Sequence, residues 1–101
     1  MRELRLSYQA QLQLKEIKDY TLKKWGNKQA KKYILGLKET NLLLSKNPHI
    51  GLHRPELSSH VFSFPYKRHV LYYKFNDTQL FILAFVHQNM LPKKHLQDKI
   101  L

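Results

Sequence analysis

The chain has 101 residues, which corresponds to one domain, residues 1–101, with one modest hydrophobic core. Lys and Arg number 18 against 7 Asp and Glu, and the formal net charge of +11 disfavours an acidic small-molecule enzyme. With 43% hydrophobic residues the chain is globular, so the positive charge lies on a folded surface. The absence of cysteine excludes disulfides, thiolate zinc sites and thiol catalysis, and fits a reducing compartment.

Two features favour a cytoplasmic protein without a membrane segment. Residues 1–7 lack the apolar core of a secretory signal. The uninterrupted apolar run over residues 80–86 is far shorter than the roughly 18 residues that a membrane helix needs.

The first half of the chain has helical periodicity. Apolar residues recur at steps of three and four over residues 8–25, with Ser7 as the expected N-cap and Gly26 as the expected stop. Asn27 is the expected N-cap of a second helix, which ends at Asn47 before a proline. The short break between them predicts an antiparallel helical hairpin.

Three aromatic residues and one glycine of this hairpin are expected to have structural roles. Tyr20, Trp25 and Tyr33 are expected in the hairpin core, since aromatic residues at helical spacing are more often core than ligand platform. Gly36 weakens the second helix by about 1 kcal/mol relative to alanine, so we expect it to mark a close crossing with the first helix.

The second half of the chain has strand patterning. Residues 48–57 contain two prolines and a glycine and read as a loop. A weaker strand pattern at residues 3–6 is expected to join the same sheet. Three further strands are predicted, at residues 60–66, 69–75 and 79–87.

The strand patterns predict an α+β fold. Residues 80–86 are apolar on both faces, which marks a central strand covered on both sides. One face receives the helices and the other meets residues 92–101 or a partner. We therefore expect a two-helix antiparallel hairpin packed on a mainly antiparallel sheet of about four strands, with a short C-terminal helix.

The helical hairpin carries most of the positive charge. Between Lys15 and Lys38 eight lysines accompany only Glu16 and Asp19. Such a run is either a solvated helix face or an electrostatic surface for an acidic partner, a nucleic acid or an acidic protein segment. The chain has only four arginines and no recognisable nucleic-acid module, which argues against direct base reading.

A second group of charged residues depends on strand register. The three-residue turn before Gln79 predicts that it pairs with Phe75. This register places Lys67 opposite His87 and puts His69 on the same face. The loop containing Arg54 could fold over this end of the sheet.

This group permits two interpretations. The two imidazoles either pack at the sheet end with their nitrogens bonded to backbone, or act in a nuclease, because cations beside an imidazole lower its pKa and leave a neutral base. The candidate residues of a nuclease would be His87, His69, Lys67, Arg68 and Arg54.

No cofactor or metal is expected. His49 and His53 have zinc-like spacing, but their segment contains proline and glycine, and Glu56 is the only carboxylate nearby. Gly-rich phosphate loops, nucleophile elbows and paired catalytic carboxylates are missing from the sequence.

A series of short motifs resembles the ParE branch of the RelE/ParE toxin superfamily over about nine tenths of the chain. Each motif alone is loose, but their order is specific. The motifs are IKDYT at residues 17–21, WGNKQA at 25–30, NPHIGLxRxEL at 47–57, where x is any residue, HVLYY at 69–73, VHQNM at 86–90 and HL at 95–96.

The resemblance implies the toxin of a type II toxin-antitoxin system. ParE-like toxins block DNA gyrase and are neutralised by a small ParD-like antitoxin with an acidic C-terminal segment, so DNA is expected to be contacted only indirectly, through gyrase or the antitoxin. The expected antitoxin-binding residues are Lys15, Lys18, Lys24, Lys28, Lys31 and Lys32. The expected target-binding residues, chosen as exposed cations at the sheet end and the C-terminal segment, are Arg54, Arg68, His87, Lys93 and Lys94.

Two alternatives stay open. RelE-like relatives share the fold and cut mRNA on the ribosome, but they usually carry an arginine where this chain has His69, and a basic or tyrosine residue after the last strand, where this chain has Gln88, Asn89 and Met90. The nuclease set is therefore incomplete, which favours the ParE branch. Leu91 stands where the ParE branch often has Asp. The other alternative is a degenerate, non-toxic protein that retains antitoxin binding.

Overall fold

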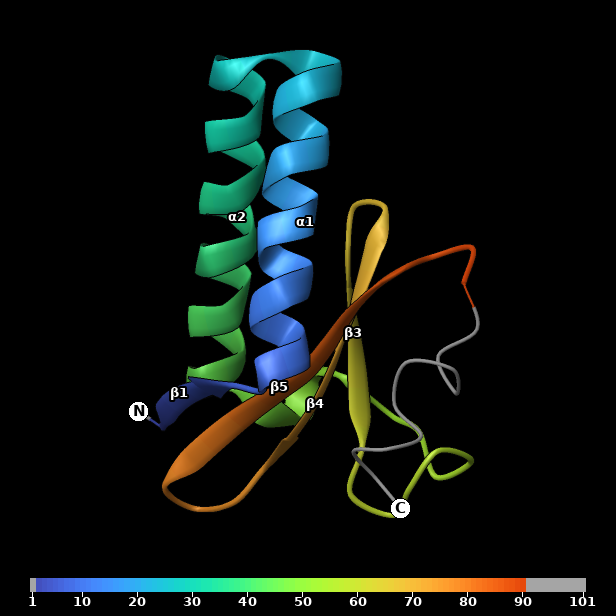
Figure 1. Cartoon of the computed structure of the whole chain (residues 1–101). Coiled ribbons are helices and arrows are strands. Elements are labelled where there is room, and N and C mark those ends of the chain that lie inside the picture. The colour runs from blue at the N-terminus through green and yellow to red at the C-terminus, as the bar shows by residue number, and fades with distance from the viewer. Residues whose placement is uncertain (1, 91–101) are drawn as a thin grey trace.

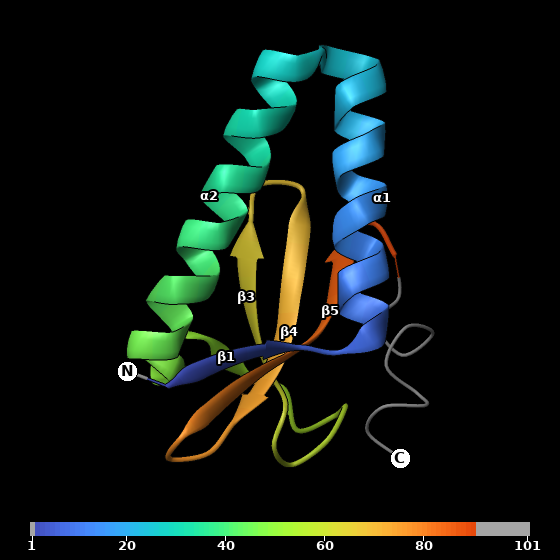
Figure 2. The same ribbon diagram turned by 60° about the vertical axis from the view of Figure 1, so that its left-hand side comes forward.

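A computed structural model describes residues 2–90 of the chain (Figure 1). A helical hairpin lies along one face of a sheet, and its turn projects beyond the sheet at one end (Figures 1 and 2). In chain order the elements are β1 (Glu3–Leu6), α1 (Tyr8–Trp25), α2 (Asn27–Lys46), the 3-10 helix η1 (Pro48–Ile50), β2 (Leu52–His53), β3 (Phe62–Tyr66), β4 (His69–Phe75) and β5 (Gln79–His87).

The helix boundaries follow from local capping. Ser7 caps α1 as predicted, because its side-chain oxygen accepts a hydrogen bond from Ala10 N at 3.0 Å. Gly26 has φ 89°, a left-handed conformation open to glycine, and it both ends α1 and precedes α2. The prediction that Asn27 caps α2 is wrong. A single glycine reverses the chain, so Asn27 is already the first helical residue.

The sheet has five strands in the order β1-β5-β4-β3-β2. The α+β fold with its helical hairpin is confirmed, and β1 adds to the otherwise antiparallel sheet by pairing parallel to β5. The extra strand beyond the expected four is β2, whose two residues are too short to leave a sequence pattern. The expected C-terminal helix, within residues 92–101, lies outside the described residues.

The register of the β4–β5 hairpin differs from the prediction. Phe75 pairs with Leu80, one residue beyond Gln79, because the turn is one residue longer than expected. A bulge between Tyr72 and Tyr73 then shifts the pairing by one more residue. His87 consequently pairs with His69 and not with Lys67. Side chains along a strand alternate between the two faces of the sheet. A total shift of two residues therefore leaves the side chains on their predicted faces.

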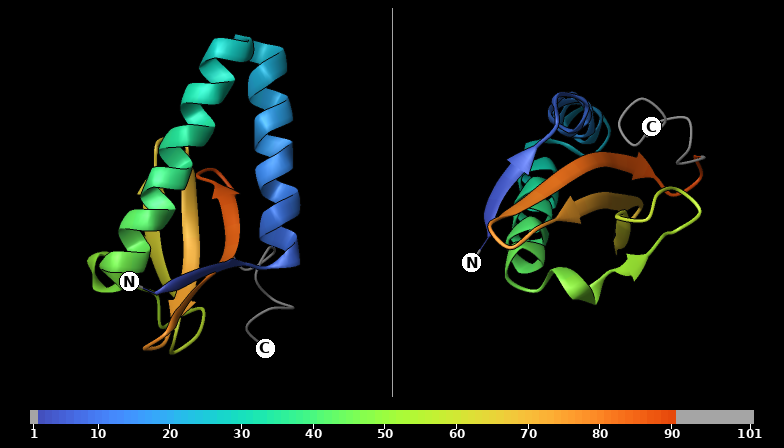
Figure 3. Two further views of the ribbon diagram at one scale, coloured as in Figure 1. Left: turned by 90° about the vertical axis from the view of Figure 1, so that its left-hand side faces the viewer. Right: turned by 90° about the horizontal axis from the view of Figure 1, so that it is seen from below.

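Each face of the sheet has its own cluster of buried side chains. On the helix side the cluster includes Ile17 and Leu37 from the helices and Leu71, Tyr73 and Ile82 from the sheet. Figure 3 shows the two helices lying along this face. This arrangement explains why β5 is apolar on both faces. On the opposite side the buried cluster consists of Val61, Tyr72, Leu83, Ala84 and Val86, with Leu57 and Val70 packed against it. Within the described residues, the segment that precedes β3 supplies cover that the sequence interpretation assigned to residues 92–101 or a partner.

Gly36 marks a close approach, but not to the first helix. A Cβ added to Gly36 would collide with the hydroxyl of Tyr66, which belongs to β3. That hydroxyl donates a hydrogen bond to Tyr33 O at 3.0 Å, and this contact joins α2 to β3. The predicted crossing with α1 is wrong because helical periodicity does not say which neighbour a glycine faces.

Across residues 2–90, the helices are too short or too polar to cross a membrane.

Candidate functional site

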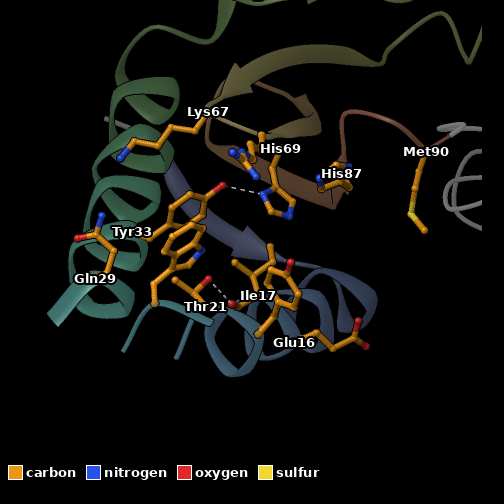
Figure 4. A pocket seen from close by; sticks show the side chains of 12 residues that line it. Glu16, Ile17, Thr21, Gln29, Tyr33, Lys67, His69, His87 and Met90 are labelled. Atoms are coloured by element: carbon orange, nitrogen blue, oxygen red, sulfur yellow. Dashed lines mark hydrogen bonds between the residues drawn. The ribbon is translucent and has the colours of Figure 1, made fainter. Parts of the chain in front are cut away.

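A pocket of about 590 Å³ lies where the helical hairpin passes the end of the sheet (Figure 4). We call it the histidine pocket, after His69 and His87. Its walls come from α1, the start of α2, the β3–β4 turn and the end of β5. The other lining residues are Glu16, Ile17, Tyr20, Thr21, Trp25, Gln29, Tyr33, Lys67, Arg68 and Met90.

His69 is held by a side chain from α2. Its Nδ1 lies 2.7 Å from the hydroxyl of Tyr33, and its ring meets that of His87 edge-on at 5.5 Å between centroids. Burial, with a smaller contribution from His87, lowers the pKa of His69 to about 4, so its imidazole is neutral at pH 7. The direction agrees with the prediction for His69, but the main cause is burial and not the neighbouring Lys67 or Arg68.

His87 and the β3–β4 turn are fixed by backbone hydrogen bonds. Asn89 N donates to His87 Nδ1 at 3.2 Å, so the ring proton of His87 lies on Nε2. Gln88 N donates to Arg68 O at 2.9 Å, which ties the chain after β5 to the turn before β4. Backbone hydrogen bonds therefore hold His87, at the end of β5, beside Arg68.

Lys67 forms the outer wall of the pocket. It adopts φ 52°, the only non-glycine residue among those described with positive φ, and the two-residue turn directs its side chain toward α2. Its Nζ stands 5.5 Å from the ring centroids of both Tyr33 and Tyr66. The cation is therefore held against aromatic rings beside the histidines.

Tyr20 and Trp25 do not belong to the hairpin core, and that prediction is wrong. Their exposed fractions are 60% and 55%, because Ile17 and Thr21 form the buried stripe of α1 and the two rings flank it. Lys24 Nζ lies 5.4 Å from the Trp25 ring centroid and donates to the Tyr20 hydroxyl at 3.1 Å. The sequence did single out Tyr20 and Trp25, because both lie in motifs that resemble the ParE branch.

Tyr33 is the functional neighbour that sequence reasoning missed. It is half-buried as predicted for a core residue, yet its hydroxyl reaches the sheet to contact His69. Burial of its side chain raises the pKa of Tyr33, so the hydroxyl stays protonated at neutral pH. The only available signal was that a tyrosine and not a phenylalanine occupies this apolar position.

Arg54 is not part of the histidine pocket. Its Nε donates to Glu56 Oε2 at 2.7 Å and its Nη1 to Ser63 Oγ at 3.3 Å, while its guanidinium covers the Tyr72 ring at 5.7 Å. Tyr72 belongs to the cluster on the opposite face of the sheet from His69. The loop thus does not fold over the histidines, because Leu57 and Val61 anchor it to the other face. Lys93 and Lys94 lie outside the described residues.

The hairpin lysines are exposed, and the structure distributes them over different surfaces. Lys18 and Lys31 line a groove of about 420 Å³ between α1 and α2, together with the apolar side chains of Leu22 and Leu35. Lys24 stands against Trp25, as described above. The remaining predicted antitoxin-binding residues, Lys15, Lys28 and Lys32, are exposed elsewhere on the two helices.

The hairpin lysines have no acidic partners in the part of the chain that the structure describes. The ion pairs found there are Arg5 with Glu3 and Arg54 with Glu56, both outside the hairpin. Within the same residues, no three His, Asp or Glu side chains gather closely enough to hold a metal ion.

Comparison with known proteins identifies the family. A family model described as the ParE toxin of the type II toxin-antitoxin system parDE matches residues 4–92. The chain belongs to the ParE toxin family. The ParE fold is also seen in a solved chain from the chromosomal ParDE toxin-antitoxin system of P. aeruginosa, with a TM-score of 0.73, 19% identity and coverage of 86% of this chain and 96% of that one. No curated protein sequence matches this ParE toxin.

The geometry limits what chemistry the histidine pocket of this ParE toxin supports. A general base works best when its pKa lies near the operating pH, and the pKa of His69 lies well below it. Lys67 and Arg68 line the pocket, but Arg54 is on the other side of the sheet. The carboxylate of Glu16 points away from both histidines (Figure 4). His69 is therefore poorly suited to act as a general base, whereas the cations and aromatic rings of the pocket suit an anionic or aromatic group.

Proposed function

We propose that this ParE toxin blocks DNA gyrase by binding it and that a small antitoxin encoded beside it neutralises the toxin. The observation that carries the proposal is the match of the ParE toxin model to residues 4–92. The separation of Arg54 from the histidine pocket supports it, because the phosphate-stabilising charges that a nuclease needs are then incomplete.

The antitoxin is proposed to bind through an acidic segment on the helical hairpin. The groove between α1 and α2 has apolar side chains, Leu22 and Leu35, between the flanking cations Lys18, Lys31 and Lys38. Leu35 is 59% exposed, so an apolar residue of the partner would remove it from water. Acidic residues beside that apolar residue would meet lysines that have no partner among residues 2–90.

The target is tested by adding purified toxin to gyrase and relaxed plasmid. We expect supercoiling to stop, or cleaved DNA to accumulate, at about stoichiometric toxin, and we expect a preformed complex with the antitoxin to be inert. Normal supercoiling and no cleaved DNA at large molar excess would refute gyrase as the target.

The proposed target-binding residues divide into separable groups. Arg68 and His87 line the histidine pocket, Arg54 lies on the other face, and Lys93 and Lys94 form a third group in sequence. Replacing each group by glutamine in the gyrase assay should show which carries inhibition. Full inhibition by all three variants would place the target contact elsewhere.

The paired histidines beside two cations keep the ribosome-dependent endonuclease as a second candidate. Induction in cells separates the two functions: a gyrase poison triggers the DNA-damage response, whereas a nuclease stops translation and leaves mRNA cut at fixed codon positions. Cuts that disappear in His87→Gln would establish the nuclease. Harmless expression without antitoxin would instead favour a degenerate toxin.

Antitoxin binding is tested by calorimetry with the antitoxin segment. Lys18→Gln with Lys31→Gln should weaken binding about tenfold and reduce its salt dependence, because both cations flank the groove. The matched control is Lys46→Gln with Lys23→Gln, which removes equal charge away from the groove lining. Equal weakening by the two variants would mean that only the overall charge attracts the segment.

A further inference from the structure

The histidine pocket combines cations with two exposed aromatic rings, Tyr20 and Trp25, to which the proposed function gives no role. Tyr20 and Trp25 present exposed rings from α1, and Lys67 and Arg68 stand at the β3–β4 turn. We propose that the pocket binds an unstacked nucleobase of a single-stranded nucleic acid and that Lys67 and Arg68 hold the adjoining phosphate. This adds a direct nucleic-acid contact to the indirect contacts expected from the sequence, and it does not depend on gyrase being the target.

The size and walls of the pocket suit a base. Its volume of about 590 Å³ falls in the range of roughly 300–1,000 Å³ that small-molecule sites occupy. Lys24 Nζ covers the Tyr20 and Trp25 rings at 5.5 and 5.4 Å. A stacked base gains more from an aromatic face than an exposed ammonium does, so the base displaces Lys24, which is then free to meet a phosphate.

The floor of the pocket offers hydrogen-bonding groups from two histidines. Among the hydrogen bonds of residues 2–90, each histidine ring uses only its Nδ1, His69 with the Tyr33 hydroxyl and His87 with Asn89 N. Both Nε2 atoms are thus left for the edge of a base. Among the described residues that line the pocket, the one carboxylate belongs to Glu16, and Figure 4 shows it on the side opposite Lys67, where the phosphate is proposed to bind.

A nucleotide fits these features better than an acidic peptide. An aspartate or glutamate side chain would use Lys67 and Arg68 but would leave the Tyr20 and Trp25 rings exposed to water. A base with its phosphate uses both, which is the combination that single-strand-binding proteins employ.

Trp25 is the only tryptophan of the chain, so its fluorescence reports on the pocket directly. Titration of the purified toxin with a thymidine octamer should quench Trp25 and saturate. Parallel titrations with a uridine octamer and with thymidine monophosphate show whether the pocket prefers DNA, RNA or a free nucleotide. Tripolyphosphate and a blunt DNA duplex bind the lysines but present no free base, and they should quench little.

Two outcomes would overturn the proposal. Equal quenching by tripolyphosphate or duplex would mean that any polyanion affects Trp25. No quenching by either octamer or by the mononucleotide at about 1 mM, far above the affinity expected from stacking, would leave a protein partner for the pocket.

Variants test the two halves of the site by anisotropy of a labelled thymidine octamer. Trp25→Leu and Tyr20→Leu should each weaken binding about tenfold by removing a stacking face. Lys67→Gln with Arg68→Gln should do the same and reduce the slope of log K against log salt by roughly 0.7, the value for one lost phosphate contact on a single strand. All four side chains lie on the surface, and circular dichroism verifies that the variants fold.

The matched control also removes two positive charges, but from α2. It carries Lys38→Gln and Lys46→Gln, and neither residue lines the histidine pocket. This variant should bind the octamer within about twofold of the unmodified toxin, because neither lysine lines the pocket and salt screens exposed charges. Equal weakening in the control and in the Lys67 and Arg68 variant would overturn the assignment. Gyrase inhibition is measured separately, so either proposal can fail without the other.

Discussion

At the scale of single residues, the histidine pocket depends on atoms that are held in place by burial and hydrogen bonding. His69 is fixed by the Tyr33 hydroxyl at 2.7 Å, and Tyr33 O in turn accepts from the Tyr66 hydroxyl at 3.0 Å. This chain connects β4 to α2 and α2 to β3. Gly36 makes room for it, because any side chain there would push against Tyr66.

We predict that His69 makes stability fall as the pH is lowered. Its pKa is about 4 in the folded protein and 6.5 without the fold, so between these values the unfolded chain takes up a proton that folded His69 does not. The stability is complete above pH 6.5 and is lost progressively toward pH 4. The loss between pH 7 and 5 should be on the order of 1 kcal/mol after solvent screening, measured by urea unfolding.

The variant His69→Gln should remove most of this pH dependence, because glutamine does not titrate and its amide can still form a hydrogen bond with the Tyr33 hydroxyl. His60→Gln, which changes an exposed histidine before β3, is the control and should retain the dependence. The same pH profile in unmodified toxin and His69→Gln would contradict the assignment.

Gly36→Ala should destabilise the toxin by about 1–2 kcal/mol in urea unfolding, although alanine is the better helix former. The added methyl group displaces the Tyr66 ring and its hydrogen bond to Tyr33 O. In a Tyr66→Leu background the same change should become neutral or stabilising by up to about 1 kcal/mol, because the obstruction is gone. A similar loss in both backgrounds would show that Gly36 matters for another reason.

At the scale of elements, the β4–β5 hairpin decides where the two histidines meet. Asn76 begins the turn, and its Oδ1 accepts from Thr78 N at 2.9 Å and from Gln79 N at 2.8 Å. The turn shifts the pairing of β4 with β5 by one residue, and the bulge at Tyr72 and Tyr73 shifts it by one more. His69 and His87 become partners only through the sum of the two.

Asn76→Ala should therefore destabilise the toxin by about 1–2 kcal/mol, because two backbone donors lose their acceptor. Asn76→Asp is the matched control, since a carboxylate retains the acceptor, and it should stay within about 0.5 kcal/mol of the unmodified protein. Urea unfolding gives both values. An alanine variant as stable as the aspartate variant would mean that the turn is held by the strands and not by Asn76.

At the scale of the whole molecule, charge is poorly compensated. The net charge is +11, and the described part of the chain contains the ion pairs Arg5 with Glu3 and Arg54 with Glu56 and no others. The helical hairpin projects past the sheet with its lysines exposed (Figure 1). The folded toxin brings these cations closer together than the unfolded chain does, so self-repulsion opposes folding.

Added salt should consequently stabilise the free toxin. Raising NaCl from about 0.02 to about 0.3 M shortens the Debye length and should raise the free energy of unfolding by on the order of 1 kcal/mol. A variant with Lys31→Glu and Lys38→Glu has four fewer net positive charges and should respond less. Stability that falls with salt in the unmodified toxin would show that favourable ion pairs outweigh the repulsion.

The sequence by itself determined the local features of this protein. Ser7 as a cap, Gly26 as the helix reversal, the two helices and the longer strands follow from side-chain chemistry that acts over a few residues. The motif series identified the ParE family, which the family model over residues 4–92 confirms.

Only the tertiary structure decided which residues share a site. The pairing of His69 with His87 depended on a turn and a bulge whose lengths leave no periodic signal. Arg54 was assigned to the wrong side of the sheet because the residues that anchor its loop, Leu57 and Val61, act through packing on distant strands. Trp25 was expected in the core and forms a pocket wall instead, since helical periodicity gives the direction of a side chain but not what lies opposite it.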